Sequence, residues 1–240
     1  YEQIFDDYFP LIMAGDHSTA YGTIAGIKKA YPKKRLGVIW IDAHADIHTP
    51  FTTPSGNMHG MPLSMACGLD NLECKVNDPR GETLDYWEQI KNVGMPGPKI
   101  LPEDLVYIAV RDLEKPENYL INKYNINFIE VEEVKKMGAA TSAQRALEML
   151  EHCDLIYVSF DVDSIDSRFS TGTGTPVPNG LTVEEAKILN AELCKDAKVC
   201  AWEIVEVNPT LDTENRMAES AFEIMEASAN SIMSRPVIAE

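Results

Sequence analysis

Short apolar runs recur along this chain, and their recurrence constrains the fold more than any other feature of the sequence. The runs cover residues 9–13, 36–41, 105–110, 126–129, 155–160 and 199–205. They are often β-branched, which is typical of strands buried on both faces of a parallel sheet. Each run is therefore predicted to form one strand.

Helical stretches separate these runs. Residues 18–30 and 214–233 have helical periodicity, Ser142 is suited to cap a helix over 142–150, and Thr182 with Glu185 forms a capping-box pattern. The alternation predicts an α/β fold of three layers, α-β-α, with a mainly parallel, doubly wound sheet. Polar residues 75–102 are expected to form a surface excursion. Nothing marks a boundary, so residues 1–240 are expected to form a single domain.

The net charge excludes several classes of partner, and the cysteine content indicates the redox compartment. The chain has 240 residues and a formal net charge of −17. Nucleic acids and anionic membranes need a basic surface, so both are excluded as expected partners, whereas a cationic substrate would be attracted. The five cysteines show no CxxC pairing, which favours reduced thiols and a cytoplasmic location. No apolar run approaches the ~18 residues of a membrane span.

Polar residues stand at the carboxyl ends of the predicted strands. In chain order, the runs lead to Gly15-Asp16-His17, Asp42, Arg111-Asp112, Asp161 and Glu206. Ligands of open parallel sheets bind at this edge. The sequence therefore predicts a functional site there.

Two acidic clusters at this edge have the spacing of metal ligands. Asp42, His44 and Asp46 stand at i, i+2 and i+4, so on an extended chain they point to one side, and Asp161 and Asp163 repeat the i, i+2 spacing. Buried carboxylates are costly unless a positive charge compensates them. Mixed carboxylate and imidazole ligands suit Mn²⁺, with Zn²⁺ or Fe²⁺ as alternatives. Either cluster alone could be a turn; together they indicate more than one divalent cation.

Two loops rich in hydroxyl groups follow the acidic clusters, at residues 49–60 and 170–176. They could fold over the site and offer hydrogen bonds to a polar substrate, or they could be generic surface loops. A phosphate-binding P-loop is excluded, because no Gly-Lys-Ser/Thr follows the glycines. Of the five histidines, His152 alone is expected to be a bystander, in a surface helix.

Taken together, these segments resemble the ureohydrolases, the arginase and agmatinase family. The matching motifs are Gly15-Asp16-His17-Ser18, Asp42-Ala43-His44-Ala45-Asp46, Ser159-Phe160-Asp161-Val162-Asp163 and Glu206-Val207-Asn208-Pro209. Residues 52–60 and 173–176 look like arginase rather than agmatinase. The resemblance implies an arginase-like fold that lacks the usual opening strand and helix, which would expose a sheet edge. It also implies a homo-oligomer, either a trimer or a hexamer.

The resemblance further implies a binuclear manganese site with two Mn²⁺ per chain. His17, Asp42, Asp46 and Asp161 would hold one ion, and His44, Asp42, Asp161 and Asp163 the other, with Asp42 and Asp161 bridging. Two cations lower the pKa of a bridging water and give hydroxide near neutral pH. That hydroxide would attack the guanidinium carbon of L-arginine, which would yield L-ornithine and urea.

The same resemblance assigns roles around the metals. Asp46 would pass a proton to the departing amine, His59 would shuttle protons, and Glu206 would pair with the guanidinium. Substrate contacts are expected from His48, Ser55, Asn57, Glu114 and Thr175. His48 stands where arginases usually carry asparagine, and Glu114 where they usually carry aspartate. Alternatives are a ureohydrolase for agmatine, a guanidino acid or formimidoylglutamate, a one-zinc deacetylase of related fold, and a non-catalytic metal-binding protein.

Overall fold

The computed structural model describes residues 8–236 as a six-stranded sheet between two layers of helices. The strands are β1 (Leu11–Met13), β2 (Leu36–Ile41), β3 (Leu105–Ile108), β4 (Asn127–Ile129), β5 (Leu155–Asp161) and β6 (Val199–Val205), in the spatial order β1-β6-β5-β2-β3-β4. All neighbouring strands are parallel. The predicted α/β fold with a parallel sheet is confirmed. The expectation that the usual opening strand is missing concerns a part of the fold outside the described residues, and it stays a prediction.

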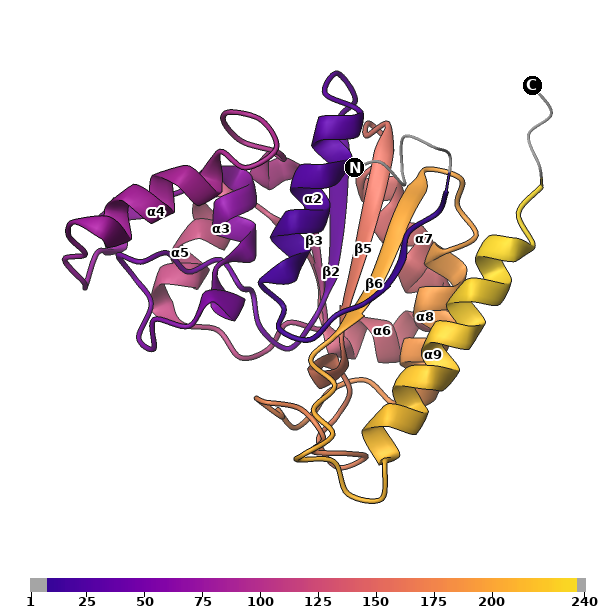
Figure 1. The fold of residues 1–240 in the computed structure, drawn as a ribbon. Coiled ribbons are helices and arrows are strands. Elements are labelled where there is room, and N and C mark those ends of the chain that lie inside the picture. Colours follow the sequence, from indigo (N-terminus) through magenta and orange to yellow (C-terminus); the bar gives the residue numbers. More distant parts are fainter. Residues whose placement is uncertain (1–7, 237–240) are drawn as a thin grey trace.

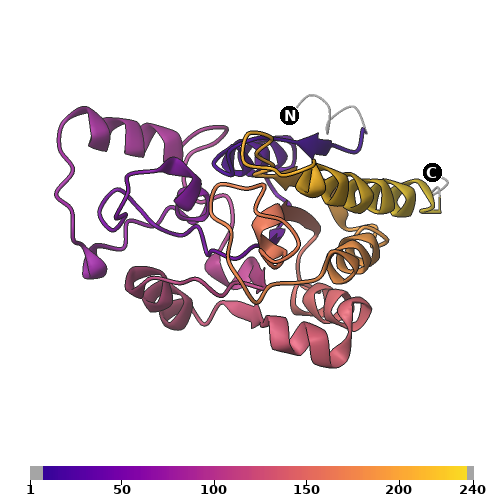
Figure 2. The same ribbon diagram turned by 90° about the horizontal axis from the view of Figure 1, so that it is seen from below.

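Helices cover both faces of the sheet (Figures 1 and 2). On one face lie α2 (Thr19–Ala30), α3 (Pro62–Cys67), α4 (Glu82–Lys91) and α5 (Lys115–Tyr124), and on the other α6 (Val131–Met137), α7 (Ala139–Met149), α8 (Val183–Leu193) and α9 (Arg216–Met233). Val38 and Trp40 of β2 belong to the first core, whereas Ile39 and Ile41 belong to the second. Because both faces are buried, the strand is apolar throughout instead of alternating.

Two helical segments differ from the prediction. Residues 75–102 are not only a surface excursion, because they contain α4, which packs Trp87 into the core. Helix α7 begins at Ala139, directly after Gly138 with its φ of +88°. Ser142 therefore lies inside α7, where its hydroxyl donates to the Gly138 carbonyl, and it is not an N-cap. His152 follows α7 and lies outside any helix.

Other local predictions are confirmed. The backbone N–H of Glu185 donates to Thr182 Oγ1 at 3.1 Å, and the Thr182 N–H donates to Glu185 Oε2 at 2.8 Å, so α8 opens with the predicted capping box. Among the described residues, no helix is both long and apolar enough to cross a membrane.

The carboxyl edge of the sheet holds an unusual backbone. Ala109 and Glu206 directly follow β3 and β6, Asp46 lies shortly after β2, and their φ angles are positive, at 69°, 65° and 48° respectively. Such conformations cost non-glycine residues of order 1–3 kcal/mol and cluster at functional sites. The fold thus pins these three turns at the edge where the sequence predicts a site.

Candidate metal centre

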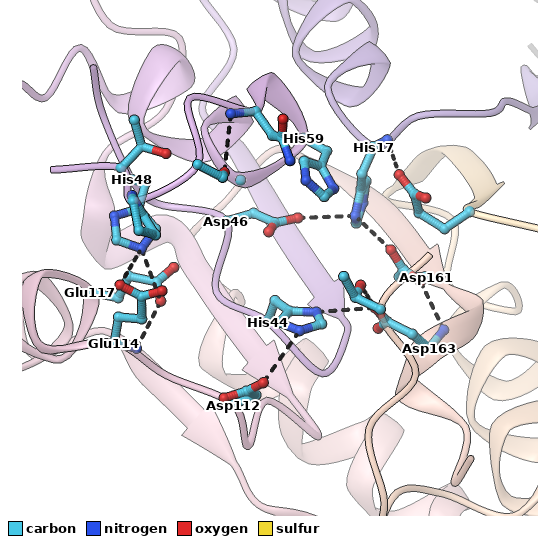
Figure 3. A pocket seen from close by; sticks show the side chains of 17 residues that line it. His17, His44, Asp46, His48, His59, Asp112, Glu114, Glu117, Asp161 and Asp163 are labelled. Atoms are coloured by element: carbon cyan, nitrogen blue, oxygen red, sulfur yellow. Dashed lines mark hydrogen bonds and ion pairs between the residues drawn. The ribbon is translucent and has the colours of Figure 1, made fainter. Parts of the chain in front are cut away.

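A pocket of about 310 Å³ opens at the carboxyl edge of the sheet (Figure 3). Apart from Asp42, which is fully buried, every side chain predicted to form the site lines it: His17, His44, Asp46, His48, Ser55, Asn57, His59, Glu114, Asp161, Asp163, Thr175 and Glu206. Residues far apart in the sequence therefore meet in one cavity. Thr53, Pro54 and Gly60 of the first hydroxyl-rich loop and the strand-end residue Asp112 also line it, although no role was predicted for them individually, and so does Glu117, which was not predicted.

Three carboxylates surround the His17 ring. Its Nδ1 lies 3.0 Å from Asp42 Oδ2, 3.1 Å from Asp46 Oδ2 and 3.1 Å from Asp161 Oδ2. His17 itself sits just before α2, where its ring stacks on Trp40 with a centroid separation of 3.9 Å. These four side chains form the first ligand group.

A second group forms around His44. Its Nδ1 lies 3.0 Å from Asp163 Oδ2 and 3.5 Å from Asp42 Oδ1. Asp42 therefore faces both histidines, one with each oxygen, which is the arrangement of a bridging carboxylate. Asp161 contacts His17, and its predicted bridging role toward the second group stays a prediction.

Local hydrogen bonds hold the acids in place. The backbone N–H of His44 donates to Asp42 Oδ1 at 2.7 Å, and that of Ala43 donates to Asp163 Oδ1 at 3.1 Å. The hydroxyl of Thr175, a predicted substrate contact, donates to Asp163 Oδ2 at 3.0 Å. Thr175 thus orients a candidate ligand from the second hydroxyl-rich loop.

Burial sets the electrostatics of the four acids. It is the main cause that raises the pKa of Asp161, Asp46 and Asp163, and the negative charge of Asp42 adds to the rise in each case. Burial opposes ionisation of Asp42 too, but its contacts with the two histidines outweigh this and lower its pKa. One acid is therefore held ionised, while its neighbours resist ionisation in the absence of a cation.

The histidines compensate only part of this charge. Burial lowers the pKa of His44, but Asp163 and Asp42 raise it to about 12. The pKa of His17 is raised as well, by Asp161, Asp42 and Asp46 against the effect of burial. Even with both imidazoles protonated, four ionised carboxylates would leave excess negative charge in the interior, which is strongly unfavourable.

The donor set fits divalent cations. His17 Nδ1 and Asp42 Oδ2 are buried, and neither forms a hydrogen bond despite their close approach. Their lone pairs are therefore directed at a shared space, as ligands of a cation require. The residues lining the pocket in the described chain include carboxylates and imidazoles but no cysteine, a set that suits Mn²⁺.

The far end of the pocket is built around His48. Its Nδ1 lies 3.0 Å from Thr52 Oγ1, and its Nε2 lies 3.7 Å from Glu114 Oε2 and 3.6 Å from Glu117 Oε2. The Nε2 atom is buried without a hydrogen-bond partner. Glu117 is held in place because it accepts the backbone N–H of Glu114 at 3.0 Å. This end thus offers one imidazole and two carboxylates to the group that enters it.

Two further pocket residues bear on this chemistry. Asp112 Oδ2 lies 3.7 Å from His44 Nε2, and the sequence placed Asp112 at a strand end of the predicted site without assigning it a role. Burial raises the pKa of Glu117 to about 7. Glu117 lies in α5, a helix that the sequence reading did not predict, so no signal pointed to it.

Glu206 and His59 lie near the first ligand group. Glu206 Oε1 accepts the backbone N–H of His17 at 2.8 Å, which fixes the carboxylate beside the cluster. His59 lies on a short 3₁₀ helix, η1 (Met58–Gly60), and is half-buried at the pocket wall. Figure 3 shows it close to His17 and Asp46.

Comparison with known proteins agrees with this geometry. The family model described as the arginase family matches residues 1–229. The arginase of Bacillus subtilis is 36% identical over 219 residues, covering 91% of this chain and 68% of that protein, and human arginase-1 is 38% identical over 203 residues, covering 84% of this chain and 58% of that protein.

Solved structures give the same result. A crystal structure of arginase from B. subtilis superimposes with a TM-score of 0.82 at 33% identity, over 99% of this chain and 75% of that one. Arginase from Bacillus caldovelox superimposes with a TM-score of 0.81 at 34% identity, over 99% of this chain and 72% of that one. The family match spans nearly the whole sequence and the ligand cluster lies inside it, so this chain is a hydrolase that belongs to the arginase family.

Proposed function

We propose that this protein hydrolyses L-arginine to L-ornithine and urea with two Mn²⁺ per chain, in a single catalytic domain. The observation that carries the proposal is the sharing of Asp42 between two ligand groups, one around His17 and one around His44. Both groups adjoin a single pocket large enough for a small polar molecule. A homo-oligomeric state and a cytoplasmic location are part of the proposal.

The bound cations supply Lewis acidity and lower the pKa of water toward neutrality. The protein supplies orientation. Glu206, anchored by the His17 N–H, presents a planar carboxylate that can accept two N–H groups of a guanidinium at once. Such a paired contact would fix the plane of the guanidinium and present its central carbon to the nucleophile.

Two residues handle protons in this proposal. Asp46 adjoins His17 and lines the pocket, where it would pass a proton to the leaving amine. His59 lies at the pocket wall and is partly exposed, so it would exchange that proton with solvent. It lies on η1 at the wall of the same pocket as Asp46 (Figure 3).

The far end of the pocket would recognise the amino-acid part of the substrate. Glu114 would bind the α-ammonium group, and the unpartnered Nε2 of His48 would donate to the carboxylate. Ser55 and Asn57 would add hydrogen bonds from the first loop. Within the described chain the pocket lining contains no lysine or arginine, and burial lowers the pKa of His48, so this imidazole would bind a carboxylate as a hydrogen-bond donor.

A substrate panel tests the proposal. Protein loaded with Mn²⁺ is assayed for urea release from L-arginine, agmatine and a guanidino acid, and its metal content is measured on the same preparation. We expect two manganese ions per chain and a kcat/KM for arginine about 10-fold or more above that for agmatine, since one lost charged contact costs about 1.5–3 kcal/mol. Comparable values for the two substrates would contradict the assignment of arginine, and a single zinc ion per chain would favour a deacetylase.

A further inference from the structure

Three side chains form a row across the middle of the sheet, directly beneath His17. Trp40 of β2 is in register with Ser159 of β5, and Ser159 is in register with Glu203 of β6. Residues in register on neighbouring parallel strands point to the same face. The row therefore lies on the face covered by α2, and His17 sits over it just before that helix.

The row holds the His17 ring by two kinds of contact. The Trp40 ring is stacked on the imidazole with an interplanar angle of 4°. Ser159 Oγ lies 2.8 Å from His17 Nε2 and donates its hydroxyl hydrogen to Glu203 Oε1 at 2.9 Å. Because a serine hydroxyl has a single hydrogen, Ser159 must accept a hydrogen bond from His17 Nε2–H. The Nδ1 atom is then the nitrogen that faces the carboxylates.

Burying the ionisable side chain of Glu203 at this position is energetically unfavourable. It is fully buried within an otherwise apolar strand. Burial raises its pKa, although the nearby His17 and the hydroxyls of Tyr157, Ser159 and Thr23 act in the opposite direction. An ionisable group with this penalty contributes little to folding stability. Its hydrogen bond from Ser159, which in turn contacts His17, is therefore the feature that calls for a functional explanation.

We propose that Glu203 and Ser159 are positioning residues that fix the tautomer and orientation of His17, and that they thereby set the affinity of one of the two cation sites. Glu203 Oε1 accepts the Ser159 hydroxyl hydrogen, and this fixes the direction of both hydrogen bonds. Among the described residues His44 has no such support, because its Nε2 faces the exposed Asp112 at 3.7 Å, too far for a hydrogen bond. The proposal rests on the proposed metal centre and is independent of which guanidino compound is the substrate.

Titration of metal-free protein with MnCl₂ in a calorimeter tests the proposal without any substrate. We expect Ser159→Ala and Glu203→Met each to weaken Mn²⁺ binding at one of two sites by about 10-fold or more, because groups that orient a histidine ligand typically contribute 10–100-fold to metal affinity. The other site should keep its affinity. Glu203→Gln retains an acceptor and should lose less than Glu203→Met, and the double variant Ser159→Ala/Glu203→Met should lose no more than either single variant.

A matched control separates this effect from loss of stability. Asn190 Oδ1 accepts a buried hydrogen bond from Trp202 Nε1 at 2.8 Å, and Trp202 is the residue before Glu203 in the chain. Asn190→Leu should lower the melting temperature of the metal-free protein and leave both Mn²⁺ affinities unchanged. The proposal is overturned if Ser159→Ala binds both ions with wild-type affinity, or if Asn190→Leu weakens binding as much as Ser159→Ala. Failure to hydrolyse arginine would overturn the proposed substrate and leave the titration result standing.

Discussion

Buried aspartates lie at both edges of the sheet, and the two edges compensate them in different ways. At the amino edge, Asp104 precedes β3 and is almost fully buried. Arg35 Nε donates to its two oxygens at 2.9 and 3.0 Å, and His152 Nε2 lies 2.8 Å from Oδ1. This acid is fully paired within the protein. His152, expected to be a bystander, belongs to the pairing.

At the carboxyl edge, no arginine or lysine pairs with the acidic cluster in the described chain. The nearest guanidinium, that of Arg111, donates to backbone carbonyls, including those of Asp163 and Val177 at 2.9 Å. The same residue types thus serve structure at one edge and leave uncompensated charge at the other. A buried acid that the fold does not neutralise indicates that a cation comes from outside.

The largest expected effect comes from Asp161→Asn at the carboxyl edge. With Mn²⁺ present, the variant should lose at least about 100-fold in kcat/KM, since even groups behind the ligands are worth 10–100-fold. In excess EDTA, with no metal bound, the same substitution should instead be favourable, because it should increase stability. Burial and two neighbouring acids raise the pKa of Asp161, so removing its charge should raise the melting temperature by a few degrees, about 1 kcal/mol. A variant less stable than wild type in EDTA would show that Asp161 is already compensated.

Asp104→Asn makes the same change at the amino edge and should give the opposite pattern. It breaks charge-assisted hydrogen bonds with Arg35, so the free energy of unfolding in urea should fall by about 1.5–3 kcal/mol both with Mn²⁺ and in EDTA. Mn²⁺ affinity should not change. Glu103→Gln is the matched control, because Glu103 is an exposed partner of the same arginine and should contribute under about 1 kcal/mol. A loss of metal affinity in Asp104→Asn would mean that the two edges are coupled.

Much of this contrast could be predicted from the sequence. Strands buried on both faces are continuous apolar runs, so the sheet could be predicted, and the residues that follow those runs predicted the acidic cluster. The pairing of Asp104 at the amino edge could not be predicted. Arg35, Asp104 and His152 precede three different strands, and nothing local links them. Their contact follows from the strand order β5-β2-β3, which is a property of the whole fold.

Short helices were the other elements that the sequence pattern did not predict. Helix α5 has a weak apolar stripe, with Leu120 as its main core residue, and it was not predicted. Glu117 was missed with it, although it is nearly buried beside His48. Its role in the pocket depends on its contact with His48, far away in the sequence, which local patterns do not encode.

Glu117 shows a third kind of compensation, by a proton. Burial raises its pKa from 4.5 to about 7 in the folded protein. Between these values the unfolded chain loses the proton while the folded one keeps it, so this group makes stability fall as pH rises, by at most about 1.4 kcal/mol per pH unit, with no further change above pH 7. Glu117→Gln removes this dependence, so unfolding free energies measured in EDTA from pH 5 to 7 should show the variant gaining on wild type. Desolvation is not screened by salt, so the difference should persist in 0.5 M NaCl, a concentration at which charges farther apart than about 5 Å are largely screened. Parallel pH profiles would mean that His48, at 3.6 Å, already neutralises Glu117 as Arg35 neutralises Asp104.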